Sequence, residues 1–338
     1  MGLAELPRLA ALVARLARFS PDAGPDPRVD ERREQRTADG LVFDDYRPRE
    51  RTRGTGTLVH GMNPEGAADP LVVHFARNVA LAGVRCLVPT LPGLADCRWD
   101  PRDLDVLARS VALAAESGLG RPGLVGFSYG ATHALAAAVR PDVAPRLRFV
   151  LAFGPCDSIA RLHADYRREW ARAPQDDAEE DDRIYAQLVL AWRHRDALGL
   201  DDKRRIELWD LLRRFCHASS LEEKRCFHAA RLAGLDLLAL EERHADRATY
   251  EALSPCGTLS RIACPVRLVH DRHDHVVPCG HSERLFSELS ALPGGAEHGL
   301  LITSLLGARK SVVLPRPTEL VRMFAALAPL LRPDVSAS

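Results

Sequence analysis

The sequence predicts an α/β protein: a doubly wound, mostly parallel sheet with an inserted helical cap. Strand and helix patterns alternate from about residue 29 to 152 and return at Pro265. Between these two stretches, the apolar residues follow helical spacing only. The segment Gly126–Gly130 also joins a short apolar run directly to a helix-like run. Alternating strands and helices imply parallel strands that are covered by helices on both faces.

Short apolar runs bounded by turn residues predict the strands, and longer periodic runs predict the helices. The expected strands cover residues 29–37, 41–48, 56–60, 84–89, 147–153, 265–269 and 300–306, with one more strand around Leu124. The expected helices of the sheet domain cover residues 69–82, 100–116, 131–139, 282–291 and 317–331. This order divides the chain into a core at 28–156 and 254–332 and a helical cap at 157–253.

Residues 1–27 are expected to form an N-terminal amphipathic helix followed by a linker. Leucines recur at three- and four-residue spacing up to Leu16, and the prolines and glycine of residues 20–27 indicate a linker. Arg15 and Arg18 interrupt the apolar stretch that a signal peptide would need. Two interpretations stay open, namely docking on the parent domain or a partner, and contact with a membrane surface.

Composition excludes several classes of function. The 338 residues include 46 basic and 46 acidic side chains, so the basic excess of a nucleic-acid-binding protein is missing. None of the eight cysteines forms a C-x-x-C pair, which favours buried reduced thiols in a cytoplasmic protein. We expect no cofactor and no metal, because no dinucleotide fingerprint, phosphate loop or strong metal-ligand cluster is visible. No apolar run is long enough to span a membrane.

The strongest functional motif is G-x-S-x-G at Gly126-Phe127-Ser128-Tyr129-Gly130. It lies between an apolar run and a helix-like run, which is the context of a nucleophile elbow. A serine on such a sharp turn sits in strained backbone, and side chains at the two glycine positions would collide with the neighbouring strand and helix. Ser128 is therefore the candidate nucleophile.

A serine nucleophile also needs oxyanion donors and an acid, which a parallel sheet supplies from loops at the carboxyl ends of its strands. The stretch His60-Gly61-Met62 ends an early strand, so the N–H groups of Met62 and Tyr129 are the candidate oxyanion hole. Asp274, after the strand at 265–269, is the candidate acid. Asp157 is a reserve acid, and Asp271 is expected to be a turn residue.

The motifs His60-Gly61, Gly126 to Gly130 and Asp274-x-x-Val277-Pro278, in that order, resemble the α/β-hydrolase fold family. The resemblance covers about residues 29 to 331, with the helical stretch in the place of the family's variable cap. It implies a Ser–Asp–His chain order for the catalytic triad and ester, thioester or amide substrates.

The histidine base is the uncertain member of this triad. The family places it in the loop after the last strand, but the expected loop, residues 307–311, contains no histidine. The nearest candidate, His298, precedes the strand, and a full-length strand would separate it from the loop by roughly 20 Å. The alternatives are His60, His273, His275 and His281, or a triad without a base. His133, on the helix after Ser128, is expected to serve packing.

The leading hypothesis is a serine hydrolase that cleaves a small-molecule ester, thioester or amide through an acyl-enzyme on Ser128. Two alternatives use the same residues: a catalytically weak or inactive binding protein that lacks the histidine, and an acyltransferase. The cap's aromatic residues are expected either to pack in its core or to line an acyl pocket; they are Tyr166, Trp170, Tyr185, Trp192 and Trp209.

Overall fold

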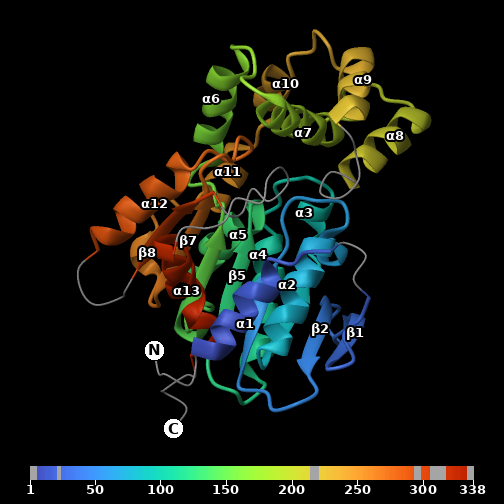
Figure 1. Ribbon diagram of the computed structural model, residues 1–338. Coiled ribbons are helices and arrows are strands. Elements are labelled where there is room, and N and C mark those ends of the chain that lie inside the picture. Colours follow the sequence, from blue (N-terminus) through green and yellow to red (C-terminus); the bar gives the residue numbers. More distant parts are fainter. Residues whose placement is uncertain (1–5, 21–23, 214–220, 293–297, 305–316, 333–338) are drawn as a thin grey trace.

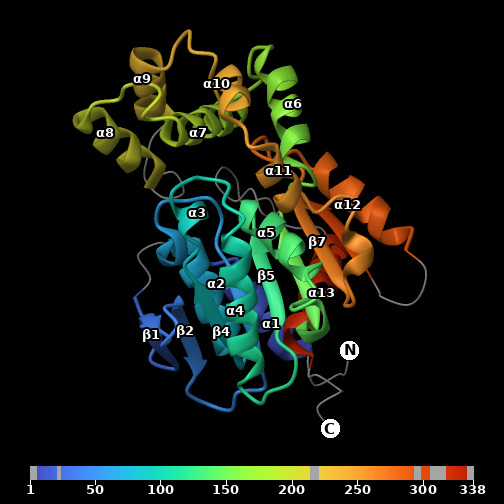
Figure 2. The ribbon, with the colours of Figure 1, turned by 180° about the vertical axis from the view of Figure 1, so that it is seen from behind.

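The computed structural model describes residues 6–20, 24–213, 221–292, 298–304 and 317–332. Its centre is an eight-stranded sheet in the order β1-β2-β4-β3-β5-β6-β7-β8. Strand β2 pairs antiparallel with β1 and β4, and the pairs from β4 through β8 are parallel. Helices cover both faces of this sheet (Figures 1 and 2). The predicted fold class is therefore confirmed.

The strands and the longer helices around the sheet lie close to their predicted positions, whereas a short helix at residues 92–95 was not predicted. The strands are β1 Val29–Arg36, β2 Val42–Pro48, β3 Gly54–Val59, β4 Val84–Pro89, β5 Gly123–Phe127, β6 Phe149–Phe153, β7 Val266–Asp271 and β8 Gly299–Thr303. The helices around the sheet are α1 Leu6–Leu16, α2 Pro70–Leu81, α3 Pro92–Ala95, α4 Asp103–Ala115, α5 Tyr129–Ala138, α12 Gly280–Ser290 and α13 Pro317–Leu331. Strand β8 begins one residue after His298 and ends at Thr303, and residues 305 and 306 of its predicted span lie outside the described residues.

The helices form two layers with a separate core on each face of the sheet. Helices α1, α2 and α13 pack on one face, around buried residues such as Phe75 and Leu151. Helices α4 and α5 pack on the other face, around Leu107, Leu124 and Leu135, with α12 beside β7 and β8. The sheet is thus buried between two apolar layers, as expected for parallel strands.

Helix α1 packs on the domain itself. Its Leu9 and Leu12 are almost fully buried in the core that α2 and α13 share. Arg15 on the same helix donates a 3.1 Å hydrogen bond from its Nε to the Asn78 side chain. The buried stripe is the one that the sequence predicts, so in this structure it faces the parent domain.

Six α-helices lie between β6 and β7 in the part of the chain that the structure describes, and we call them the cap helices. They are α6 Ile159–Trp170, α7 Asp177–Arg193, α8 Asp202–Arg213, α9 Leu221–Arg231, α10 Leu237–His244 and α11 Arg247–Leu253. Figure 1 shows α6 to α10 as a layer beyond one end of the sheet, with α11 between them and the sheet. The chain enters and leaves this layer at one place, because the Ile159 N–H donates to Ser254 Oγ (3.1 Å) and the Cys256 N–H to the Asp157 carbonyl (3.1 Å).

The described cysteines form no disulfide. Cys86, Cys97, Cys156 and Cys264 are buried, Cys226 is exposed, and Cys256 and Cys279 are intermediate; Cys216 lies outside the described residues. Burial raises the pKa of the Cys97 thiol to about 12, so this group stays protonated. Among the described helices, none combines the length and apolar character needed to cross a bilayer.

Candidate active site

Ser128 lies between β5 and α5 in a strained backbone conformation. Its φ of 51° and ψ of −126° are unusual for a residue with a side chain. A Cβ at Gly126 would come within 2.5 Å of the Gly130 carbonyl oxygen, and a Cβ at Gly130 within 2.0 Å of the His60 carbonyl oxygen. Both flanking positions therefore require glycine, as the sequence motif predicts, and the turn presents Ser128 at the end of β5.

The loop after β3 lies against Ser128. A Cβ at Gly61 would be 3.5 Å from the Ser128 Cβ, so the backbone approaches the serine closely. The N–H groups of Met62 and Tyr129 donate no hydrogen bond to another described residue. Free N–H groups on two segments that flank a serine could receive a developing negative charge. Their role as an oxyanion hole stays a prediction.

Two cap tyrosines hold these segments. Tyr185 on α7 donates from its hydroxyl to the Met62 carbonyl oxygen at 2.8 Å. Tyr166 on α6 donates to the Val276 carbonyl oxygen at 2.7 Å, and its hydroxyl is 2.8 Å from that of Tyr129. The cap helices thus contact both proposed oxyanion residues and the loop after β7 through buried hydroxyl groups.

Asp274 lies on the loop after β7 with its carboxylate fixed by the backbone. Its Oδ1 accepts hydrogen bonds from the N–H groups of Val276 (2.9 Å) and Val277 (2.8 Å). Its Oδ2 is directed toward Gly154, where a Cβ would lie 3.4 Å from Asp274 Oδ2 and 4.0 Å from Ser128 Cα. Asp271 Oδ1 accepts from the His273 N–H at 2.8 Å, as expected of a turn residue. The structure therefore brings Ser128 and Asp274 together around Gly154.

The comparison with solved structures identifies this architecture. An esterase mutant is 15% identical over 95% of this chain and 87% of its own, with a TM-score of 0.51. An acylaminoacyl peptidase with a bound chloromethyl ketone is 15% identical and covers 90% of this chain, with a TM-score of 0.50. The chain has the α/β-hydrolase fold.

Other matches agree on this fold but extend well beyond the chain. A puromycin-hydrolyzing peptidase of Mycobacterium tuberculosis is 16% identical over 90% of this chain, with a TM-score of 0.50. The chain spans only 40% of that peptidase and 41% of the acylaminoacyl peptidase. No protein-family model and no curated protein matches the chain. These similarities at low identity establish the fold.

Within the α/β-hydrolase fold, His298 lies at the amino ends of the strands, whereas Ser128 lies at their carboxyl ends. Its Nδ1 accepts a 3.2 Å hydrogen bond from the N–H of Val266, the first residue of β7. Because β7 and β8 run parallel, Arg267 pairs with Gly299 near the amino ends of the two strands. Asp271 pairs with Thr303 at their carboxyl ends, where the loop that carries Asp274 begins. The length of β7, which is five residue steps of about 3.3 Å each, therefore separates His298 from the end of the sheet where Asp274 lies. The structure does not bring His298 together with Ser128 and Asp274.

The alternative histidines have other partners. His60 is fully buried; its Nδ1 is 2.7 Å from the Gly61 carbonyl oxygen and its Nε2 accepts from the Leu91 N–H at 3.1 Å. Burial lowers the pKa of His60 to about 4. His281 is buried between the carboxylates of Asp157 and Asp165. Both rings are bonded to these neighbours, and neither forms a hydrogen bond with Ser128.

The remaining candidate histidines also form no hydrogen bond with Ser128 in the described structure. His273 is exposed, and the half-buried His275 donates its backbone N–H to Asp182 at 3.3 Å. His133 is buried as packing predicts: its Nδ1 is 2.9 Å from the Tyr129 carbonyl oxygen, and its ring stacks on Trp99. No described residue forms a hydrogen bond with Ser128 Oγ. Residues 305–316 follow β8 outside the described residues, and their sequence contains no histidine.

His270, which was not among the candidate bases, lies beside the acid. Its Nε2 is 3.5 Å from Asp274 Oδ2 and 3.9 Å from the Cβ position of Gly154. Both ring nitrogens already have partners, with Nδ1 2.7 Å from Ser282 Oγ and Nε2 2.7 Å from the Val277 carbonyl oxygen. His270 therefore braces the acid loop, and only its position four residues before Asp274 could have drawn attention to it.

The reserve acid Asp157 belongs to a separate buried cluster. Although burial opposes ionisation, hydrogen bonds from His281 and Arg284 lower the pKa of Asp157 to about 2. Arg284 donates from Nε at 2.8 Å, and Arg161 contacts the same carboxylate. Donor atoms of Cys156, Asp157 and His281 lie within 4.8 Å of one another, as in a metal site. Two guanidinium groups on this carboxylate and a thiol kept protonated by burial disfavour a cation there.

Proposed function

We propose that this protein is a serine hydrolase that cleaves small-molecule acyl compounds through an acyl-enzyme on Ser128. The observation that carries the proposal is the Ser128 φ of 51°, held between two positions that admit only glycine. Such backbone strain costs on the order of 1–3 kcal/mol and is found chiefly at functional sites. An ordinary strand-to-helix turn would not need it.

The neighbouring groups support the same chemistry. Ser128 Oγ would attack the acyl carbon, and the free N–H groups of Met62 and Tyr129 would stabilise the oxyanion that forms. Asp274 keeps one carboxylate oxygen on two backbone N–H groups and directs the other toward the site. The half-buried Ser128 side chain is accessible to a substrate.

No described histidine forms a hydrogen bond with Ser128 Oγ, and this narrows the set of preferred substrates. A histidine in a triad protonates the leaving group, which an amide needs because it releases a basic amine. A thiolate or an activated alkoxide departs without that proton, since its conjugate acid has a much lower pKa. In the proposed step the Ser128 Oγ–carbon bond forms, the carbon–sulfur bond breaks, and the serine proton passes to solvent or to the departing thiolate. Thioesters and activated esters are therefore the proposed substrates.

A fluorophosphonate probe tests the nucleophile directly. Intact-mass spectrometry should show one adduct on the native protein and none on Ser128→Ala. His298→Ala should be labelled at the native rate, because the His298 ring lies at the amino end of β7, away from Ser128. An aryl thioester and the matching anilide then test the leaving-group argument, with turnover expected only for the thioester. Equal labelling of the native protein and Ser128→Ala would overturn the proposal.

A second candidate is a binding protein that retains the fold without strong catalysis. The observation that favours it is the lack of any described hydrogen-bond partner for Ser128 Oγ. Loss of the base leaves a rate enhancement of about 10³–10⁴ over water when the oxyanion site is intact. The probe separates the two candidates, because a binding protein without an activated serine would show no Ser128-dependent adduct after prolonged incubation.

A further inference from the structure

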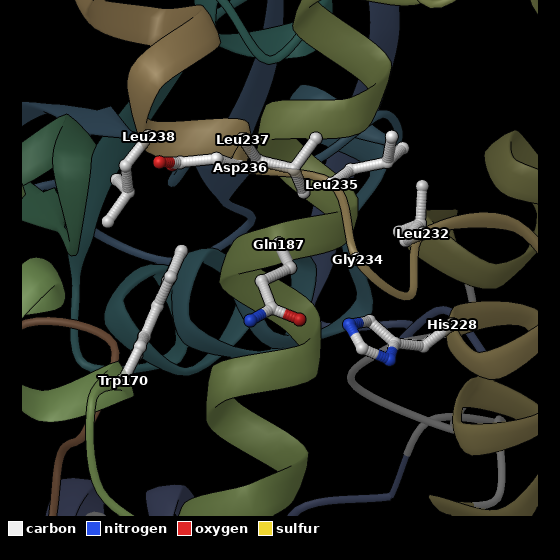
Figure 3. Close-up of a pocket in the computed structure, with 9 residues that line it drawn as sticks. All are labelled: Trp170, Gln187, His228, Leu232, Gly234, Leu235, Asp236, Leu237 and Leu238. Atoms are coloured by element: carbon white, nitrogen blue, oxygen red, sulfur yellow. The ribbon is translucent and has the colours of Figure 1, made fainter.

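A cavity of about 210 Å³ opens among the cap helices, away from the residues proposed for catalysis. Helices α6, α7, α9 and α10 surround it, and the turn between α9 and α10 closes one side. Its lining consists of Trp170, Gln187, His228, Leu232, Gly234, Leu235, Asp236, Leu237 and Leu238. Figure 3 shows Gln187 between Trp170 and His228, with Leu235, Leu237 and Leu238 arranged along another side. An apolar cavity of about 150 Å³ holds benzene, so this space suits one substituted ring.

Two polar side chains in this cavity form no hydrogen bond with the described protein. Neither the Gln187 amide nor the His228 ring makes a hydrogen bond with any described residue. Other polar groups of the same helices are paired, for example Lys224 with Asp181 at 2.7 Å and Arg193 with Glu241. Gln187 and His228 are each only half-buried, so the amide and the imidazole lie open beside the apolar walls of the cavity, where one ligand could bind both.

The electrostatics of the cavity favour an uncharged ligand. Burial lowers the pKa of His228, against an opposing attraction to Glu180, so the imidazole is neutral near pH 7. The Asp236 carboxylate is engaged by the Ala239 N–H at 2.8 Å, with Arg167 at 3.8 Å. A neutral imidazole offers one donor and one acceptor, and an amide offers both as well. These groups match a ligand that also carries a donor and an acceptor side by side.

From this geometry we propose that the cap cavity binds a neutral, planar small molecule in which an aromatic ring carries a carboxamide or a similar donor–acceptor pair. The ring lies among Trp170 and the leucines, and its polar edge bonds to Gln187 and His228. Trp170 also stacks on Tyr166, with ring centroids 4.9 Å apart and an interplanar angle of 13°. Tyr166 in turn contacts Tyr129 and the Val276 carbonyl oxygen of the acid loop. A ligand on Trp170 would therefore be linked through Tyr166 to residues beside Ser128.

Benzamide is the probe for this proposal, and the Ser128→Ala protein is the receptor, so that binding is measured apart from any hydrolysis. The chain has four tryptophans, and a Trp170→Phe spectrum assigns the Trp170 indole N–H signal. Benzamide should shift that signal with a Kd of roughly 1–10 mM, as expected for a fragment of this size. Benzoate and toluene should bind at least roughly fivefold more weakly, because one is charged and the other lacks hydrogen-bonding groups.

Matched variants keep the test specific. Gln187→Leu and His228→Leu should each weaken benzamide binding roughly fivefold or more, whereas Gln175→Leu and His244→Leu, at exposed cap positions, should leave it unchanged. Gln187→Glu, nearly identical in shape, provides a second variant if the leucine protein does not fold. Toluene binding equal to that of benzamide, no shift at Trp170, or unchanged affinity in all cavity variants would each overturn the proposal. The fluorophosphonate result does not affect this measurement.

Discussion

The Tyr185 hydroxyl donates a 2.8 Å hydrogen bond to the Met62 carbonyl oxygen and thereby joins α7 to the loop beside Ser128. Arg193, on the same helix, adds a 3.5 Å contact to the Met62 sulfur and a 3.0 Å hydrogen bond to the Cys97 carbonyl oxygen. One cap helix thus determines where the backbone next to the serine lies. The precision of the proposed oxyanion hole then depends on the cap helices as well as on the sheet.

Tyr185→Phe should therefore slow fluorophosphonate labelling of Ser128 roughly tenfold, since the Met62 backbone loses its tether. Loss of this single hydrogen bond should cost about 1 kcal/mol of unfolding free energy. Tyr46→Phe is the matched control: it removes another buried hydroxyl, which contacts Arg33 on the far strands. A labelling rate that falls equally in both variants would show that the effect is general destabilisation.

Gly130→Ala should destabilise the fold by about 3 kcal/mol, because its Cβ would lie 2.0 Å from the His60 carbonyl oxygen and the backbone must move. Urea unfolding followed by circular dichroism measures the difference. Gly24→Ala is the control, since no atom lies within 4 Å of the Cβ position there. If the two variants unfold at the same urea concentration, the close approach of α5 to the His60 loop is wrong.

Stability should fall as the pH is lowered from 6.5 toward 4. Burial lowers the pKa values of His60, His133 and His163 to about 4 in the folded protein, whereas the unfolded chain titrates near 6.5. The unfolded state therefore binds more protons in this window, and each ring contributes a slope of up to about 1.4 kcal/mol per pH unit. His133→Phe should remove one such contribution from urea-derived unfolding free energies. Parallel pH profiles for the variant and the native protein would contradict this account.

Glu241→Gln should cost about 3–5 kcal/mol of unfolding free energy, because it leaves the buried Arg193 guanidinium uncompensated. Burial opposes ionisation of Glu241, but Arg193, His194 and Tyr250 bind its carboxylate and hold its pKa well below the usual range. The adjacent Glu242 pairs with Arg167 at the surface, so Glu242→Gln should change stability by less than about 0.5 kcal/mol. Similar unfolding midpoints for these two variants would argue against a buried ionic cluster.

The features that could be predicted from the sequence are those that short segments determine by themselves. The elbow at Gly126–Gly130 is one, because its backbone admits no other residue at the glycine positions. The backbone-bound Asp274 loop is another, since its hydrogen bonds span only three residues. Apolar periodicity likewise placed the strands and the longer helices of the sheet domain close to their observed bounds.

Features that depend on contacts between distant segments could not be predicted. Nothing local distinguishes Gly154, although its Cβ position lies between Ser128 and Asp274. The tyrosines of the cap were expected from helical spacing, but their bonds to Met62 and Val276 join residues more than a hundred positions apart. His298 was a candidate base from the sequence, but the register of β7 and β8 places it at the amino ends of these strands, away from Ser128.

The neighbouring entry and exit of the cap helices have a consequence for how this protein can be rebuilt. Because Ile159 bonds to Ser254 and Cys256 bonds to Asp157, the two ends of a long insertion already meet. A short turn could therefore bridge them without moving β6 or β7, and the closure entropy would be small. The cap helices can therefore be treated as an exchangeable module. Grafting a different helical segment at the same junction would change the residues that cover Ser128, while the strands of the sheet keep their order and connections.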